Sequence, residues 1–570
     1  LVEGTTIESL QHAIKDKDAY PEIEWDATVR VGEALTEAET QFLAERRERV
    51  ARAVSAFLNE EVDPRDVPVI GIASSGGGCR AMIASLATFE TFDRVGLLRG
   101  TTYIAGVSGS TWAMSSLYSV GRDWDALRDR LQKQLSDNYL SVRDLVNAIN
   151  SPDGPQVLMG MAQKYFGDRS FSTVDLYGTL LSARVRAAGN IHHGPQRNFG
   201  KLSDQRWAMT YEDLPLPIYT AVSHEVGKKE AKYQWWEFTP FEVGFQKMLP
   251  SQQRLFSAWV PTWSFGRQFE KGESVERLPE ISLGLLLGTF GSAFTASVAA
   301  IWNEFQDVLP KTLQQRILPL LEDISQVHPI SPATFPNPLY HLRRPESPDD
   351  TDDDLAILNA PTLALMDAGF ENNIPFAPLL RQERQVDLVI AVDASMDVGV
   401  DPWLRKAEKY AKERGVVFPP LPLPETGDAK GKEVTDDAEA RCRIFSTIKD
   451  AAHINTRSPE THRQAPSDQS HAPPPLSHDF TLIYLPLLRN PTYSATLDPQ
   501  RTEWCATHNF TFTPSQTAQL AGLANANVEE SLERIRDAVR RAWRAKRARR
   551  ERRERERWGR KMEDGPAEEF

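Results

Sequence analysis

The chain has 570 residues, of which 41% are hydrophobic and 25% charged, and its formal net charge is −13. This composition is typical of a globular protein with a large apolar core and excludes a fibrous or low-complexity chain. The three cysteines, at positions 79, 442 and 505, lie far apart and lack metal-type spacing. They argue against a disulfide framework and indicate a reducing compartment.

The first elements are predicted to form an N-terminal helical arm over residues 1–66. The stretch up to Tyr20 has no apolar core of signal-peptide type, so the protein is not expected to be secreted. Thr36-Glu37-Ala38-Glu39 is a capping box, and a charged helix with an apolar stripe is predicted from there to about Glu60. We expect this helix to pack on the domain that follows.

The next segment alternates strands and helices around two sharp turns. A buried strand is predicted over Val67–Ile72, then a glycine turn at Gly76–Gly78, a helix over Arg80–Gly96 and a second strand over Thr102–Val107. Ser108 follows at once, where the chain turns into another helix. Such a turn exposes the hydroxyl above the sheet, and bare N–H groups of the glycine turn can face the same point. The pair suits acyl transfer, which needs a nucleophile and an oxyanion hole.

A nucleotide site is an alternative interpretation of the glycine turn. Gly76–Ala81 also matches the pattern G-x-G-x-x-G/A, which would make the protein a nucleotide-binding α/β oxidoreductase. That site expects an acidic residue at the end of the second strand, where this chain has Gly106-Val107-Ser108. A phosphate-binding P-loop would need Gly-Lys-Ser/Thr after the glycines, and Cys79-Arg80 does not supply it.

A second alternative is an esterase of the α/β-hydrolase type, with a serine, aspartate and histidine triad. Of the eleven histidines, His224 alone is near the end of a predicted core strand. Histidines that follow Asp367, as the usual triad order requires, are His453, His462, His471, His478 and His508. Most of these lie in a stretch that is predicted to be a disordered insertion. The serine turn also departs from G-x-S-x-G, because Gly109 directly follows Ser108.

Further strands and helices are predicted along the rest of the chain. The strands are Pro217–Val222, Gln234–Phe238, Thr362–Met366 (ending at Asp367), Val386–Val392 and Phe480–Leu485. Helices are expected between 123 and 188, at Pro375–Leu380 and at Pro402–Arg414. The apolar stretch Ile281–Trp302 is long enough to span a membrane, but its Gly, Ser and Thr content and the absence of a basic flank favour a buried helix.

Three segments are predicted to lie outside this regular pattern. Residues 241–270 are rich in aromatic residues with little periodicity, which is typical of an irregular buried region or of a lid that meets lipid. Residues 343–355 are acidic, and residues 456–478 are rich in Pro, Ser, His and Gln. Both are predicted to be disordered surface insertions.

The C-terminal part, residues 531–570, is predicted to be a basic helix or tail. Fifteen basic and four acidic residues lie between Arg534 and Lys561, and the Ala, Arg and Glu content favours a helix capped near Asn525–Asn527. A solvated charged helix is the simpler interpretation, and a patch for anionic lipid is the alternative. No sequence motif supports a nucleic-acid partner.

Three motifs carry a resemblance to a known family. Ser75–Met82, Gly106–Trp112 and Met366–Pro375 resemble the catalytic signature of the cytosolic phospholipase A2 and fungal lysophospholipase (phospholipase B) family, and Leu287–Phe294 resembles a further family segment. The resemblance implies an α/β fold of three layers, α/β/α, with a central, mostly parallel mixed sheet. This patatin-like lipid acyl hydrolase core would cover residues 67–530 and carry a helical or irregular cap.

The resemblance also implies the chemistry. It makes Ser108 the nucleophile and Asp367 the base of a dyad without histidine, with Gly77 and Gly78 in the oxyanion hole and Arg80 on the substrate phosphate. The implied reaction is hydrolysis of a fatty-acyl ester of a glycerophospholipid or lysophospholipid through an acyl-serine. It uses no metal and no cofactor.

The expected partner is a phospholipid membrane surface, to which a cytoplasmic protein would bind peripherally. No nucleic acid and no obligate protein partner is expected. Because only 66 residues precede the catalytic core, calcium-triggered targeting is not expected either.

Overall fold

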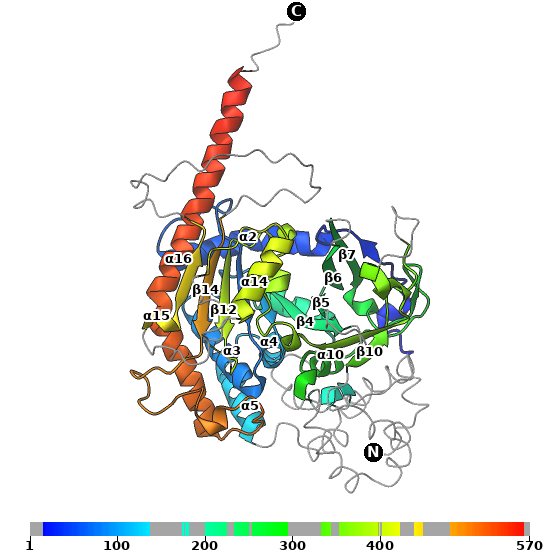
Figure 1. Ribbon diagram of the computed structural model, residues 1–570, viewed down its shortest axis with the longest axis horizontal. Helices are drawn as coiled ribbons and strands as arrows, with labels where there is room; N and C mark the ends of the chain where they lie inside the picture. Colours follow the sequence, from blue (N-terminus) through cyan, green and yellow to red (C-terminus); the bar gives the residue numbers. More distant parts are fainter. Residues whose placement is uncertain are drawn as a thin grey trace, which may run out of the picture.

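The structure is a computed structural model. It describes residues 15–136, 174–175, 177–179, 181, 200–224, 233–249, 254–294, 332–343, 353–396, 398, 402–421, 438–448 and 479–563. A mixed sheet of twelve strands lies at the centre, with helices packed around it (Figure 1). The α/β class and the layered architecture predicted from the sequence are confirmed.

The sheet has a parallel centre and antiparallel flanks. Its strands, with the separate β8–β9 hairpin, are β1 (Arg30–Val31), β2 (Ile70–Ser74), β3 (Tyr103–Gly106), β4 (Leu216–His224), β5 (Tyr233–Phe238), β6 (Glu242–Leu249), β7 (Arg254–Pro261), β8 (Phe269–Glu270), β9 (Glu273–Ser274), β10 (Ala333–Pro336), β11 (Thr362–Asp367), β12 (Leu388–Asp393), β13 (Arg443–Ser446) and β14 (Thr481–Pro486). The order is β1-β7-β6-β5-β4-β3-β2-β12-β14-β13, and β11 joins β10 to β4. Strands β4, β3, β2, β12 and β14 are mutually parallel. The seven strands predicted from the sequence are all present.

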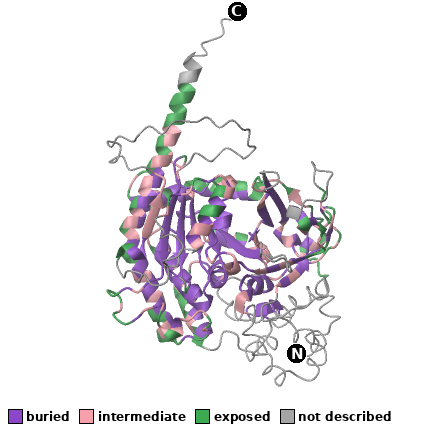
Figure 2. Ribbon diagram, in the orientation of Figure 1, coloured by how far each residue is buried: buried purple, intermediate pink, exposed green. Residues whose placement is uncertain are grey.

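Helices flank this sheet in two groups. They are α2 (Glu37–Leu58), α3 (Gly78–Arg94), α4 (Gly109–Val120), α5 (Trp124–Ser136), α9 (Arg206–Tyr211), α10 (Leu283–Phe290), α13 (Phe376–Leu379), α14 (Pro402–Glu413), α15 (Ala438–Arg441) and α16 (Pro514–Glu563). Helices α3, α4, α5 and α16 pack on one another, whereas α13 lies against β2, β3, β5 and α14. Every residue of β2, β3, β12 and β14 is buried (Figure 2). Strands covered on both faces are apolar throughout rather than alternating, which is why the sequence showed them as short apolar runs.

The N-terminal helix packs on the rest of the domain, as the sequence predicted. Thr36 Oγ1 accepts a hydrogen bond from the Glu39 N–H at 3.0 Å, as the capping box predicted, and α2 buries its apolar stripe in the core. Strand β1 pairs with β7, so residues before α2 extend the sheet. A boundary at residue 66 therefore separates neither the core nor the sheet into two units.

The described residues of 241–270 differ from the irregular region or lid that the sequence predicted. They form β6, β7, a 3₁₀ turn at Thr262–Ser264 and β8 instead of an irregular region or a lid. Phe256, Trp259 and Phe265 are at most 4% exposed, so these rings are not available to lipid. Strands buried on both faces lack the alternation by which a strand is usually detected, and this hid β6 and β7 in the sequence.

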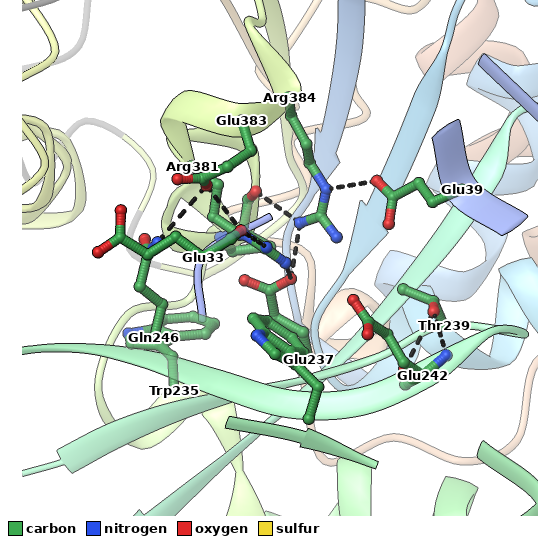
Figure 3. A network of polar contacts seen from close by, with 12 residues as sticks. Glu33, Glu39, Trp235, Glu237, Thr239, Glu242, Gln246, Arg381, Glu383 and Arg384 are labelled. Atoms are coloured by element: carbon green, nitrogen blue, oxygen red, sulfur yellow. Dashed lines mark hydrogen bonds and ion pairs between the residues drawn. The ribbon is translucent and has the colours of Figure 1, made fainter. Parts of the chain in front are cut away.

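A buried cluster of charged side chains ties α2 to the sheet (Figure 3). Arg384 donates to Glu39 Oε1 at 3.0 Å and to Glu237 Oε2 at 2.6 Å, and Arg381 reaches the same Glu237 oxygen at 3.4 Å. The Arg381 guanidinium also lies 4.1 Å from the centroid of the Trp259 ring. Because each charge has a partner of opposite sign, the cost of burying it is offset. The cluster fixes the segment after α13 against α2 and β5.

Helix α16 packs along α3 and α5 and then extends away from the domain (Figure 1). Thr513 and Gln516 cap it reciprocally, since each backbone N–H donates to the other side chain, at 2.9 and 3.2 Å. The start predicted at Asn525–Asn527 is wrong. Asn527 lies inside the helix, where its Nδ2 donates to the Leu488 carbonyl at 2.8 Å. A tertiary partner thus satisfies a side chain that resembled a cap, and the boundary expected at 530/531 falls inside a continuous helix.

Basic side chains of α16 neutralise buried acids of the domain. Lys546 and Arg549 pair with Asp387 at 2.7 and 3.0 Å, and Arg550 pairs with Asp66 at 2.6 Å. Asp387 and Asp66 are only 4% and 1% exposed. The helix beyond these pairs is exposed (Figure 2). The part of the basic stretch that lies along the domain therefore has a structural role. Its far end extends into solvent.

Several predicted features lie outside the described residues. They are most of the helices expected between 137 and 188, residues 295–302 of the predicted buried helix, the insertions at 344–352 and 456–478, the side chain of His224, and His453, His462, His471 and His478. Within the described part, α10 is the buried helix expected from Ile281 onward. No helix in the described ranges combines the length and apolar composition that a membrane crossing needs.

Candidate active site

Ser108 stands between β3 and α4, where the backbone turns sharply. Its φ of 52° and ψ of −122° lie in a region that residues other than glycine rarely adopt. Ser110 holds this turn, because its Oγ donates to the Ser74 carbonyl at 2.8 Å and accepts from the Val107 N–H at 2.9 Å. The turn places the Ser108 hydroxyl at the carboxyl edge of the parallel strands, over the N-terminus of α4, as predicted.

Gly109 shows why the motif differs from G-x-S-x-G. A Cβ at residue 109 would overlap with the carbonyl oxygen of Gly78 and lie 2.9 Å from the Gly78 nitrogen. The first turn of α4 therefore packs directly on the backbone of the glycine turn, which only a residue without a side chain allows. This close approach brings Ser108 next to Gly77 and Gly78.

Gly77 and Gly78 supply free backbone donors beside the serine. Their φ values of +141° and +62° suit glycine, and both residues stand at the start of α3. Neither N–H is bonded to an acceptor in the part of the chain that the structure describes. Unbonded N–H groups and the positive end of the helix dipole make the first turn of a helix attractive to an anion.

Asp367 ends β11 with a buried carboxyl group. The Gly369 N–H donates to its Oδ1 at 2.9 Å, and the Ala293 N–H and the Ser108 hydroxyl lie close enough to the carboxylate to lower its pKa. Its own N–H donates to Ser292 Oγ at 2.9 Å. Burial raises the pKa of Asp367 to about 6, although the three donors act in the opposite direction. A carboxylate with this pKa is a stronger base than an exposed one and is still ionised at neutral pH.

The Ser108 hydroxyl thus lies close enough to the Asp367 carboxylate to lower its pKa. His508 is exposed and forms no hydrogen bond or ion pair with Ser108 or Asp367. Strand β3 ends at Gly106, and the residues from there to Ser108 do not include the acidic residue that a dinucleotide site would use. In the described ranges no three His, Cys, Asp or Glu residues gather as metal ligands would.

Arg80 is fully buried and donates to the backbone of other segments. Its Nε reaches the Ala394 carbonyl at 2.9 Å, and its Nη1 reaches Pro499 O at 3.1 Å and Met396 Sδ at 2.6 Å. In this arrangement the side chain ties α3 to the segments that follow β12 and β14. Contact between Arg80 and a substrate phosphate remains a prediction, since a guanidinium nitrogen would have to leave one of these acceptors.

The structure adds residues that sequence reasoning did not place in the site. Ser292 and Ala293 position Asp367, and the only signal for them was the resemblance of Leu287–Phe294 to a family segment. A Cβ at Gly78 would lie 2.5 Å from the Thr507 carbonyl oxygen and 3.3 Å from the Phe294 ring. Phe294 in turn packs edge-on against Phe510, with ring centroids 5.3 Å apart. The residues that pack over Gly78 in this way come from segments without a periodic apolar pattern, so the sequence carried no signal for their position.

Comparison with known proteins identifies the family. Residues 70–407 match the family model of the lysophospholipase catalytic domain. The match spans more than half of the chain and includes Ser108, the glycine turn and Asp367. The chain belongs to this family.

The chain is also similar to several cytosolic phospholipases A2. It is 27% identical to mouse cytosolic phospholipase A2 zeta over 582 residues, which cover 91% of this chain and 62% of the relative. It is 28% identical to human cytosolic phospholipase A2 beta over 448 residues, which cover 70% of this chain and 54% of the relative. The chain therefore spans little more than half the length of these relatives.

Solved structures show the same fold. Human GIVD cytosolic phospholipase A2 aligns with a TM-score of 0.66 and 22% identity, covering 91% of this chain and 68% of that one. The same human protein in complex with methyl gamma-linolenyl fluorophosphonate aligns with a TM-score of 0.60 and 23% identity. This alignment covers 92% of this chain and 66% of that one. At this identity the likeness establishes the fold of the lysophospholipase catalytic domain.

Proposed function

We propose that this protein is a serine lipid acyl hydrolase that cleaves fatty-acyl esters of glycerophospholipids or lysophospholipids. One observation carries the proposal: the Ser108 hydroxyl lies close to the buried Asp367 carboxylate and beside the free N–H groups of Gly77 and Gly78. A nucleophile, a base and two oxyanion donors are the groups that ester cleavage requires.

In the first half of the proposed reaction, Ser108 Oγ attacks the carbonyl carbon of the ester while Asp367 takes the hydroxyl proton. The carbonyl oxygen becomes an oxyanion, which the Gly77 and Gly78 N–H groups stabilise. The bond between the carbonyl carbon and the glycerol oxygen then breaks. Asp367 returns its proton to that oxygen, so an alcohol leaves and an acyl-serine remains.

In the second half, water replaces the alcohol. Asp367 takes a proton from the water as its oxygen attacks the acyl-serine, and the same two N–H groups hold the second oxyanion. The bond to Ser108 Oγ breaks, Asp367 protonates this oxygen, and a fatty acid leaves. The dyad is then ready for another cycle, with no group consumed other than water.

The phospholipid substrate is proposed from the family and from the names of its relatives, which are cytosolic phospholipases A2. We propose that the protein works at a phospholipid surface in the cytoplasm, as a peripheral protein, because such substrates reside in membranes. Arg80 is the proposed ligand of the phosphate, since a guanidinium suits phosphoryl oxygens. This role requires rearrangement of its contacts with Ala394, Met396 and Pro499.

The test is active-site labelling combined with product analysis. A fluorophosphonate probe should label the protein at Ser108 alone, and Ser108→Ala and Asp367→Asn should both lose hydrolysis. A phospholipid with a different labelled acyl chain at each position, analysed by mass spectrometry, identifies the ester that is cleaved. Labelling at another serine, or full activity in Ser108→Ala, would remove the proposal.

A further inference from the structure

Asn373 links the loop after Asp367 to the glycine turn. Its Nδ2 donates to the Gly76 carbonyl oxygen at 3.3 Å, and its own carbonyl accepts from the Gly76 N–H at 3.0 Å. Both polar groups of Gly76 are therefore bonded to one residue that lies far away in the sequence. The motif Met366–Pro375, which carries the base, thus also holds the turn that carries the oxyanion donors.

The carbonyl that Asn373 holds belongs to the same peptide group as the Gly77 N–H. A peptide unit is planar, with its C=O and N–H pointing in opposite directions, so fixing the Gly76 oxygen fixes the direction of the Gly77 N–H. A bond to the carbonyl oxygen also polarises the unit and makes its N–H a better donor. The Ser75 hydroxyl also donates to this oxygen, at 3.0 Å, so Ser75 and Asn373 hold the peptide unit from two sides. Because glycines flank the unit, the local backbone itself offers little resistance to its rotation.

The Gly78 N–H, the second proposed oxyanion donor, is oriented by a different contact. The Gly78 N–H belongs to the peptide unit of Gly77, whose carbonyl accepts from the Ala81 N–H at 3.4 Å in the first turn of α3. Helix formation therefore orients the Gly78 donor, whereas the side chains of Asn373 and Ser75 orient the Gly77 donor. The two halves of the oxyanion hole depend on separate parts of the chain.

Space around Gly76 shows that the asparagine, the glycine turn and the serine meet at one point. A Cβ at residue 76 would overlap with Asn373 Oδ1, and it would lie 3.0 Å from Ser108 Cβ and 3.3 Å from Val107 Cγ1. Asn373 Oδ1 also lies 3.1 Å from where a Cβ of Gly369 would stand, as does Asp367 Oδ1. The carboxamide thus occupies the space between the nucleophile turn and the loop that holds the base.

We propose that Asn373 is a positioning residue of the reaction: its side-chain amide orients the Gly77 N–H toward the oxyanion. This inference rests on the proposed function of Ser108 and Asp367. A donor that is aligned in this way contributes in the transition state, where the oxyanion forms, and contributes little to binding of the uncharged ester.

The experiment compares Asn373→Ala and Asn373→Asp with the wild-type protein on a soluble monomeric ester. Both variants lack the amide donor. The second keeps nearly the same shape but adds a negative charge, so only a loss that both variants share is assigned to the missing bond. We expect kcat to fall by about 10- to 100-fold in both, with KM changed by less than about threefold. The rate of fluorophosphonate labelling at Ser108 should fall in parallel, because that reaction also builds negative charge on an oxygen beside the turn.

Asn372 provides a matched control in the same loop. It is fully buried, its Nδ2 donates to the Trp403 carbonyl at 3.0 Å, and its Oδ1 accepts from the Ile374 N–H at 3.0 Å. Asn372→Ala should lower the melting temperature while kcat per labelled site stays within about threefold of the wild type.

Three outcomes would overturn the inference: unchanged kcat in both Asn373 variants, a rise in KM with unchanged kcat, or an equal fall of kcat in folded Asn372→Ala. Failure of the proposed function looks different, because the wild-type protein itself would then neither hydrolyse the ester nor react at Ser108.

Discussion

The Asp367 N–H donates to Ser292 Oγ across 2.9 Å and so joins the end of β11 to the turn after α10. The Ala293 N–H, one residue later, is within reach of the carboxylate itself. A segment far from both Ser108 and Asp367 in the sequence therefore sets the position and the surroundings of the base.

The pH dependence of activity should report Asp367. Burial raises its pKa to about 6, and only the ionised form can accept the proton of Ser108. We expect kcat/KM on a soluble ester to fall about tenfold for each pH unit below about 6. A pH series from 4.5 to 8 measures this limb, and a limb near pH 4 would contradict the buried base.

The ionised form of Asp367 that activity requires should lower the stability of the folded protein. The pKa of Asp367 is raised from 3.8 to about 6 on folding, so ionisation disfavours the folded state. This cost is absent below about pH 3.8, grows as the pH rises through the folded pKa and is complete above it. At 1.36 kcal/mol for each pKa unit it reaches about 3 kcal/mol.

Asp367→Asn should therefore raise the free energy of unfolding at pH 7.5, and by clearly less at pH 4.5, while it abolishes hydrolysis. Urea unfolding of wild type and variant at the two pH values measures both gains. Equal gains at the two values would show that the effect comes from packing rather than from charge.

Strain at Ser108 predicts a difference between two inactive variants. Both Ser108→Ala and Ser108→Gly should lose at least about 10⁴-fold in kcat/KM, because each lacks the nucleophile. Only glycine adopts φ 52° and ψ −122° without strain, so Ser108→Gly should be more stable than Ser108→Ala by about 1 kcal/mol. Denaturant unfolding of the pair tests this, and equal stabilities would show that the turn is not strained.

Asp387 should anchor the C-terminal helix. Its carboxylate accepts from the Val69 N–H at 2.8 Å and pairs with Lys546 and Arg549. Asp387→Asn would leave these cations without their partner at a buried site, and we expect a loss of about 3 kcal/mol in the free energy of unfolding. Glu551→Gln, which breaks only a solvent-exposed pair with Arg547, should change it by less than about 0.5 kcal/mol. Comparable losses in the two variants would contradict an anchoring role.

Variants at the far end of α16 can test whether its basic residues assist membrane binding. Arg552, Arg553, Arg555 and Arg557 are exposed beyond the pairs with the domain. Changing all four to Gln should weaken binding to anionic vesicles, by up to about 1 kcal/mol for each residue that contacts the surface, and most at low salt. Hydrolysis of a monomeric ester should not change. Removal of the whole helix is unsuitable, because it also removes buried core residues such as Ile535 and Val539.

The same charge change on the body of the domain is the control for this variant. Arg47, Arg52, Lys409 and Lys412 are also exposed. If their replacement by Gln weakens vesicle binding as much as the change on α16 does, net charge rather than the helix end governs binding.

The sequence by itself determined the unit around Ser108. Apolar runs, a glycine turn and a serine on a tight turn act over a few residues, and α3, β3 and α4 follow from these local preferences within a few residues of the predicted ends. The same is true of the capping box at Thr36 and of β11 ending at Asp367. The resemblance of the motifs to a family then named the candidate residues.

Only the tertiary structure decided what those residues meet. Burial on both faces turned residues 241–270 into strands without an alternating pattern, and Leu488 satisfied Asn527 in the middle of a helix. The acceptors of Arg80 and the partners of Asp367 come from segments far away in the chain. Local propensity acts between neighbours in sequence, whereas burial, pKa shifts and side-chain hydrogen bonds depend on which distant segments share a core. For that reason the candidate residues of the site could be named from the sequence, but not the contacts that position them.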